Sequence, residues 1–164
     1  MNSNFTSFWH KSKQLCDFLQ YPQNLSVKVY RQQLLILLLN VYTGGVQLQH
    51  NNEAGDDELI DDELTDQVEH LELAFEDEIG DVNYYVDSYN PYEFKENPLV
   101  TASLIDELNE IFRQLKVQLL KLETNDDKWI ADAEWTIQFH LNLSLLNELI
   151  DVSRALHYAL EIDE

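Results

Sequence analysis

Apolar residues recur along most of the chain at spacings of three and four, which is the spacing of one face of an α-helix. This spacing predicts a first helix over residues 4–20, which ends before Pro22 because the residue preceding a proline avoids the helical region. A second helix is predicted over residues 25–42, with Gly44 and Gly45 as its left-handed end cap. The middle of this helix is apolar all round, which predicts a central, buried position.

A third helix is predicted to begin near Asp57 or Thr65 and to end at Ile79, because apolar residues there follow the helical spacing (Leu64, Val68, Leu71 and Phe75). Residues 47–58 have almost nothing to bury, so we expect a mobile acidic loop inside the domain. Residues 80–98 contain two Asn-Pro pairs, and we expect an irregular connection whose aromatic side chains seal the bundle (Tyr84, Tyr85, Tyr89, Tyr92 and Phe94).

The clearest amphipathic stripe of the chain follows Ser103, whose hydroxyl is expected to cap the first turn of a fourth helix. A last helix is predicted from Asp127 to about Leu160, with two apolar faces. The chain is 164 residues long, a length typical of one domain. The fold class we predict is therefore all-α, a single-domain bundle of about five helices over residues 1–164 with an acidic loop and helix segment.

The acidic residues of this chain are concentrated in one segment. This concentration indicates a helical protein that binds a partner. Residues 53–96 hold seventeen carboxylates against one base, Lys95, within a net charge of −21 for the whole chain. A protein that needs only solubility would spread its acids and intersperse lysines. Such a local field repels nucleic acid and anionic membranes and speeds encounter with a basic protein. The expected partner-binding residues are Asp56, Asp57, Glu58, Asp61, Asp62, Glu63, Asp66, Glu69, Glu72, Glu76 and Asp77.

The sequence shows no pattern for membrane targeting or for disulfide cross-linking. The N-terminal residues show no signal-peptide pattern, and the most apolar run, residues 34–39, is too short to span a membrane. Cys16 is the single cysteine, which excludes an internal disulfide, and its apolar neighbours indicate a buried thiol. We therefore expect a cytoplasmic protein.

The sequence carries no recognised catalytic or metal-binding motif, so we expect no enzyme activity, no cofactor and no metal. A di-iron bundle needs Glu-x-x-His, and none of the five histidines has a glutamate three residues before it. Asp66 and His70 are one helical turn apart and could recruit Glu69 or Glu76, but such a pair is usually a solvated face. No phosphate-binding glycine loop, calcium loop or His-Glu-x-x-His motif occurs.

Three stretches of the chain carry a family resemblance: residues 81–91 (DVNYYVDSYNP), residues 103–116 (SLIDELNEIFRQLK), and Ala133-Glu-Trp135 through Phe139-His140 to residues 153–157 (SRALH). Together they resemble a bacterial all-helical family known as domain of unknown function 5063. The resemblance implies a helical fold and a bacterial origin, and it implies no catalytic residue.

These observations lead to one main functional hypothesis and one alternative. The main hypothesis is an immunity or inhibitor protein, whose acids neutralise a basic bacterial toxin or nuclease by occupying its positive groove. The alternative is a cytoplasmic accessory or adaptor module that docks a basic protein without inhibiting it. Plain solubility is the competing explanation for the acidic segment.

Overall fold

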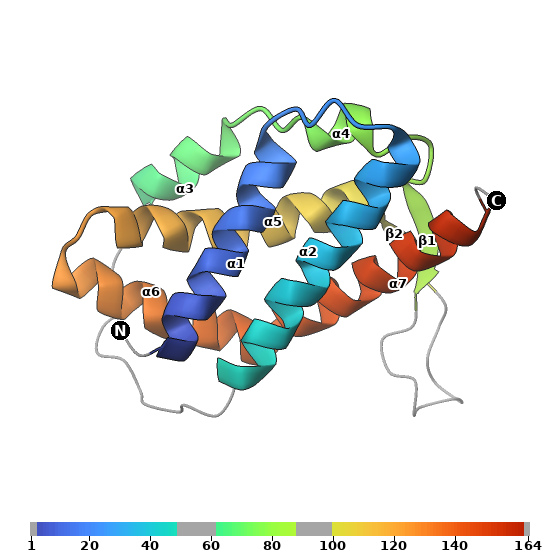
Figure 1. Cartoon of the computed structure of the whole chain (residues 1–164). Coiled ribbons are helices and arrows are strands. Elements are labelled where there is room, and N and C mark those ends of the chain that lie inside the picture. Colours follow the sequence, from blue (N-terminus) through green and yellow to red (C-terminus); the bar gives the residue numbers. More distant parts are fainter. Residues whose placement is uncertain (1–2, 49–61, 88–99, 163–164) are drawn as a thin grey trace.

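The computed structural model describes residues 3–48, 62–87 and 100–162, and over these ranges the fold is all-α, as predicted (Figure 1). The elements in chain order are α1 (Ser3–Gln20), α2 (Val27–Leu48), α3 (Asp62–Glu69), α4 (Phe75–Glu78), β1 (Tyr84–Asp87), β2 (Val100–Ser103), α5 (Leu104–Glu123), α6 (Asp127–His140), the π-helix η1 (Leu141–Leu145) and α7 (Leu146–Ile162).

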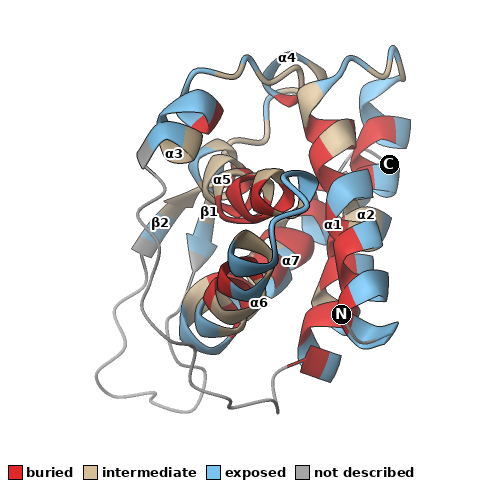
Figure 2. Ribbon diagram, turned by 90° about the vertical axis from the view of Figure 1, so that its left-hand side faces the viewer, coloured by how far each residue is buried: buried red, intermediate tan, exposed pale blue. Residues whose placement is uncertain are grey.

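The helices form two packed layers. The pair α1 and α2 lies in front of α5, α6 and α7, and α3 and α4 run along the outer side of α5 (Figures 1 and 2). The buried faces of the two layers meet in one apolar cluster, which contains Phe8, Leu34, Leu115 and Leu149 with no exposed surface. This arrangement follows from the helical stripes in the sequence, because each stripe must be covered by another element.

The predicted end of the second helix is wrong. Helix α2 continues through Gly44 and Gly45 to Leu48, so these glycines are not a cap and residues 47–48 of the expected loop are helical. The reason is close packing: a Cβ atom on Gly45 would lie 2.7 Å from Leu141 Cδ2 and 3.0 Å from Leu146 Cδ2. Glycine therefore lets α2 approach η1 and α7, and the packing outweighs the helix-breaking tendency of glycine. The rest of the expected loop, from residue 49, lies outside the described residues.

The predicted central position of α2 is also wrong. One face of α2 is buried, but the opposite face is in solvent, with Ile36 59% and Leu39 38% exposed. The helix belongs to the α1–α2 layer, and one side of it faces solvent (Figure 2). An apolar helix normally avoids this position, so the exposed face of α2 requires an explanation.

The third helix is interrupted. Helix α3 ends at Glu69, where the N–H of Leu71 donates to the carbonyl of Val68, and the chain becomes helical again only at Phe75. Leu71 and Leu73 both pack against the core. Two residues separated by one position point in nearly opposite directions on a helix, and the non-helical connection lets both half-buried side chains pack against the core.

The irregular connection predicted over 80–98 contains a strand. Strands β1 and β2 pair antiparallel, with Tyr84 opposite Ser103. Tyr85 packs against the core and its hydroxyl donates to Glu107, whereas Tyr84 is 74% exposed and seals nothing. The other aromatic residues named for this segment lie outside the described residues. The predicted cap of α5 is confirmed, because Ser103 Oγ accepts a hydrogen bond from the N–H of Asp106 at 3.2 Å.

The predicted last helix is continuous in direction but not in hydrogen bonding. Residues Leu141–Leu145 form a π-helix between α6 and α7. A π-helix inserts an extra residue per turn and so changes which side chains face the neighbouring helix. Here Leu141 and Leu145 are buried, and Leu143 is 63% exposed.

Candidate partner-binding groove

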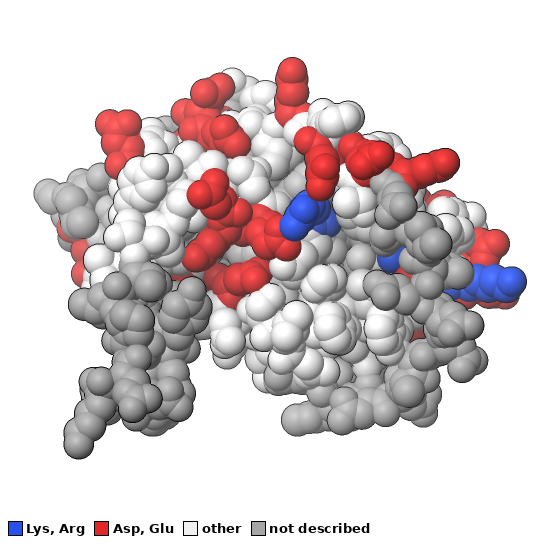
Figure 3. Space-filling model, turned by 180° about the vertical axis from the view of Figure 1, so that it is seen from behind, with Lys and Arg blue, Asp and Glu red and all other residues white. Residues whose placement is uncertain are grey.

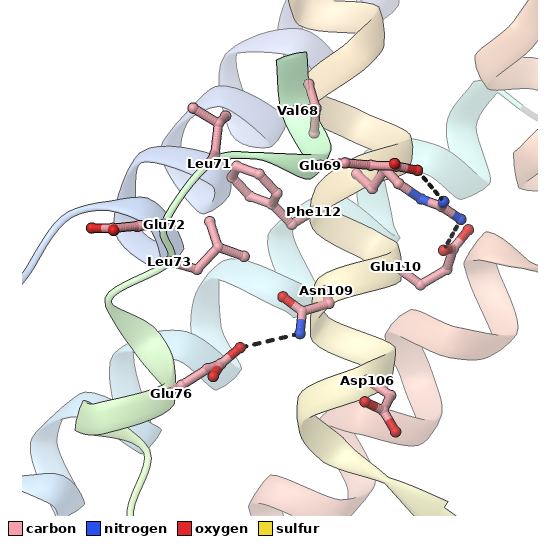
Figure 4. Close-up of a pocket in the computed structure, with 11 residues that line it drawn as sticks. Val68, Glu69, Leu71, Glu72, Leu73, Glu76, Asp106, Asn109, Glu110 and Phe112 are labelled. Carbon is pink, nitrogen blue, oxygen red and sulfur yellow. Dashed lines mark hydrogen bonds and ion pairs between the residues drawn. The ribbon is translucent and has the colours of Figure 1, made fainter. Parts of the chain in front are cut away.

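A groove of about 640 Å³ lies between the α3–α4 segment and α5 (Figure 4). Its apolar floor is formed by Val68, Leu71, Leu73 and Phe112. Around this floor stand five carboxylates, with one arginine and one asparagine among them (Glu69, Glu72, Glu76, Asp106, Glu110, Arg113 and Asn109). The groove therefore combines an apolar surface with a net charge of −4, from five acids and one base.

Two contacts tie the walls of the groove together. Arg113 on α5 forms an ion pair with Glu69 on α3 at 3.3 Å and a second one with Glu110 on its own helix. Further along, Asn109 Nδ2 donates to Glu76 Oε1 at 3.3 Å (Figure 4). These contacts join α3 and α4 to α5, and the groove is present in the chain without a partner.

The α4 wall is anchored on its other side by the connection between α1 and α2. The Glu78 carboxylate accepts hydrogen bonds from the backbone N–H groups of Gln23, at 2.9 and 3.0 Å, and of Asn24, at 2.7 Å. Buried Arg31 donates from Nε to the carbonyl of Ile79 at 2.8 Å. Gly80 follows with φ +75°, and a Cβ there would lie 2.9 Å from the Arg31 guanidinium. Glu78 is thus an acid of the acidic segment that has a structural role.

The charge extends beyond the groove. Figure 3 shows acidic side chains gathered over the back of the molecule, with few basic side chains among them.

Polar contacts connect the groove to the interior through Gln114. Its Nε2 donates to Glu110 Oε1 at 2.9 Å and to Glu148 Oε2 on α7 at 3.3 Å. Burial raises the pKa of Glu148, and the nearby charge of Glu110 adds to this effect.

The structure assigns the predicted binding residues to three groups. Glu69, Glu72 and Glu76 line the groove, where Glu72 points outward from the α3–α4 connection (Figure 4). Glu63, Asp66 and Asp77 are exposed on α3 and α4 without lining it, and Asp62 is the first residue of α3. The remaining predicted residues lie outside the described ranges (Asp56, Asp57, Glu58 and Asp61).

The second wall of the groove was missed by sequence reasoning. Asp106, Glu110 and Arg113 lie on α5, thirty or more positions after the acids that they face. A signal was present, because these three residues are spaced four and three apart on the polar side of the amphipathic stripe. The stripe reveals which side of α5 is polar, but it does not reveal that α3 and α4 pack beside that side.

Other chemistry finds little support among the described residues. No group of three or more His, Cys, Asp or Glu side chains within residues 3–48, 62–87 and 100–162 could hold a metal ion, and Asp66 and His70 are both exposed. Cys16 is buried as predicted, and burial raises the pKa of its thiol to about 12, which makes it a poor nucleophile. None of the described helices is long and apolar enough to cross a membrane.

The fold has a counterpart among solved structures. The crystal structure of protein BF1032 from Bacteroides fragilis is similar, with a TM-score of 0.69 and 16% sequence identity over 95% of this chain and 91% of that one. At this identity the similarity shows the fold alone. No curated protein matches the chain. The model of a domain of unknown function, DUF5063, matches residues 1–161, and this chain therefore belongs to that family.

Proposed function

We propose that this protein is a non-catalytic binding module that docks a basic protein in the groove between α3–α4 and α5. The observation that carries the proposal is the apolar floor with Glu69, Glu76, Asp106 and Glu110 around it, while Glu72 points outward at its edge. Acids that served only solubility would have no need of a preformed recess with Phe112 and Leu73 at its base. A basic segment with one apolar side chain satisfies both features, because its cations meet the carboxylates while the apolar group covers the floor.

The lining residues favour binding over catalysis. Within the described part of the chain, the groove is lined by carboxylates, an amide, a guanidinium and apolar groups, with no thiol, hydroxyl or imidazole. Two of the carboxylates, Glu69 and Glu110, are already held by Arg113. Of the other three acids, Glu76 and Asp106 are placed to receive cations in the groove, and Glu72, which points outward, can meet a cation at its edge.

The biological form that we propose is neutralisation of a basic bacterial toxin or nuclease. A nuclease binds phosphates in a positive groove, and an acidic protein that covers this groove excludes the substrate. A basic partner that is harmless by itself would instead indicate an accessory module. The two forms share the same docking surface and differ in what the partner does.

The docking proposal is tested with two variants that change the net charge equally. Glu72→Gln/Glu76→Gln removes two charges from the groove. Glu123→Gln/Glu161→Gln removes two exposed charges elsewhere, and Glu123 is ten residues beyond Arg113, or about 15 Å along α5. Each protein is immobilised and used at low salt to capture proteins from a bacterial extract. We expect at least one basic protein that wild type and the control variant retain and the groove variant loses.

The captured protein then decides the biological form. We expect its association with the groove variant to be slower by about tenfold or more at low salt, since steering depends on the local field. Expression of a toxin should arrest growth, and co-expression of wild type should relieve this arrest better than the groove variant does. Equal retention of every basic protein by both variants would contradict docking in the groove.

A further inference from the structure

We propose that the outer face of α2 is the surface through which two copies of this chain associate. Apart from Val27, its first residue, four apolar residues of this helix are exposed: Val29 39%, Ile36 59%, Leu39 38% and Val46 40%. The opposite face of the same helix is buried in the core through Tyr30, Leu34, Leu38 and Val41. An α-helix that is apolar on both sides is normally covered on both sides, and in the single chain α2 is covered on one.

The exposed residues follow the pattern of a helix–helix seam. Counted from Val29, the a positions of a seven-residue repeat are Val29, Ile36 and Thr43, and the d positions are Gln32, Leu39 and Val46. All six are exposed. Alternating spacings of four and three within a repeat of seven form the stripe that packs against a second helix in a coiled coil. The stripe runs along most of α2, which spans 22 residues.

The residues beside this seam favour a second copy as the occupant. The e positions are Gln33, Asn40 and Gln47, three exposed amides, and the g positions are Lys28, Leu35 and Tyr42, of which only Lys28 is charged. Charges at the e and g positions of a coiled coil set the choice of partner helix. Amides carry no charge and so do not repel an identical helix. Helix α2 contains no acidic residue at all, in a chain of net charge −21. The outer face of α2 therefore has no negative charge that would repel a second copy of this anionic chain.

The neighbouring surface extends the contact. A recess of about 340 Å³ lies between α2 and the η1–α7 segment, and no charged residue lines it. Tyr42 and Val46 form one side, and Leu143 and Ile150, which are 63% and 39% exposed, form the other. The acidic groove, by contrast, lies against α5 on the layer behind α2 (Figures 1 and 2). Pairing through α2 would thus direct both acidic grooves away from the interface and leave them open to other partners.

Sedimentation equilibrium of the complete chain over a range of concentrations tests this proposal. We expect wild type to approach twice its mass of 19.3 kDa. The variant Ile36→Lys places a charge at the centre of the seam and should weaken association by at least about tenfold. The control is Val86→Lys, because Val86 on β1 is also β-branched, is 63% exposed, and gives the same change in charge. The control should associate like wild type.

Added salt distinguishes this surface from the acidic groove. Sodium chloride should strengthen pairing through α2, because it screens the repulsion between two anionic chains. It should weaken docking of a basic protein in the groove for the same reason. Wild type that stays monomeric up to about 0.5 mM would overturn the proposal, and so would a dimer that Ile36→Lys leaves intact.

A cysteine experiment probes the seam without adding charge. Val29→Cys and Val46→Cys are oxidised separately and as a mixture, while the native Cys16 is buried and does not compete. Parallel pairing of α2 with its copy predicts a disulfide within each single variant, and antiparallel pairing predicts one only in the mixture. Either result supports the seam. Cross-linking of Val86→Cys but of neither seam variant would contradict it.

Discussion

Lys121 Nζ lies 2.6 Å from Asp132 Oδ2, and the two side chains are 1% and 4% exposed. This ion pair joins α5 to α6 in the interior, and the ring of Trp129 is centred 5.8 Å from the same ammonium group. Both charges have lost their hydration, so each depends on the other. The pair carries no overall charge, and it marks Asp132 as an acid that acts in packing and not on the surface.

The first prediction concerns this pair. Lys121→Met should lower the free energy of unfolding by about 3–5 kcal/mol, because it leaves the Asp132 carboxylate buried without its cation. The double variant Lys121→Met/Asp132→Leu should recover most of this loss, since an apolar pair of similar volume needs no hydration. Urea denaturation measures both. A double variant less stable than Lys121→Met would show that the ion pair is not the origin of the effect.

The second prediction concerns Gly45. Gly45→Ala should lower the free energy of unfolding by about 1–3 kcal/mol, because the new methyl group would overlap Leu141 and Leu146. Gly44→Ala is the control, because its methyl group would lie 3.3 Å from Phe8 Cδ2, a smaller overlap than the one at Gly45. Both changes raise helix propensity by about 1 kcal/mol, so a difference between them measures packing. Two equally stabilised variants would mean that Gly45 is not needed for close approach.

The third prediction concerns the pH dependence due to Glu148. Burial raises the pKa of this carboxyl above its ordinary value of 4.5, so the folded state holds its proton at pH values where the unfolded state has released it. This contribution to the free energy of unfolding therefore falls as the pH rises above 4.5. Glu148→Gln should stabilise the fold at pH 7, and its advantage over wild type should disappear below the unfolded pKa.

The exposed Glu123→Gln serves as its control, since it removes the same charge from the surface. Thermal denaturation of both variants between pH 4 and about pH 8 shows whether the benefit is specific. A stability gain at pH 7 that is the same for both variants would assign the effect to net charge. A gain at Glu148 that persisted at pH 4 would exclude its ionisation as the cause.

The fourth prediction concerns the net charge of −21. Repulsion among the unpaired carboxylates opposes the compact state, and salt screens it. Moderate sodium chloride should therefore raise the melting temperature by a few degrees, or roughly 1 kcal/mol of stability for a chain of this size. The variant Ile36→Lys is used so that association does not contribute. A melting temperature that falls with salt would show that favourable ion pairs outweigh the repulsion.

The periodicity of the sequence was sufficient to predict most of the helices. Helix α1 runs from Ser3 to Gln20 against a prediction of 4–20, and Ser103 caps α5 as expected. These features depend on neighbours three or four positions away, so they can be read from the chain itself. The concentration of acids could be read in the same way, because charge follows from composition.

What those acids form depends on how the helices pack in three dimensions. Glu69 and Glu76 become one wall of a groove because α5 brings Glu110 and Asn109 beside them, and no local pattern specifies that contact. Gly45 is helical, although glycine usually ends helices, because Leu141 and Leu146 pack against its bare Cα. The chain is not helical between Glu69 and Phe75, where Leu71 and Leu73 both pack against the core. Local hydrogen bonds and side-chain spacing are written in the sequence itself, whereas the space available at each position is set by residues far away along the chain.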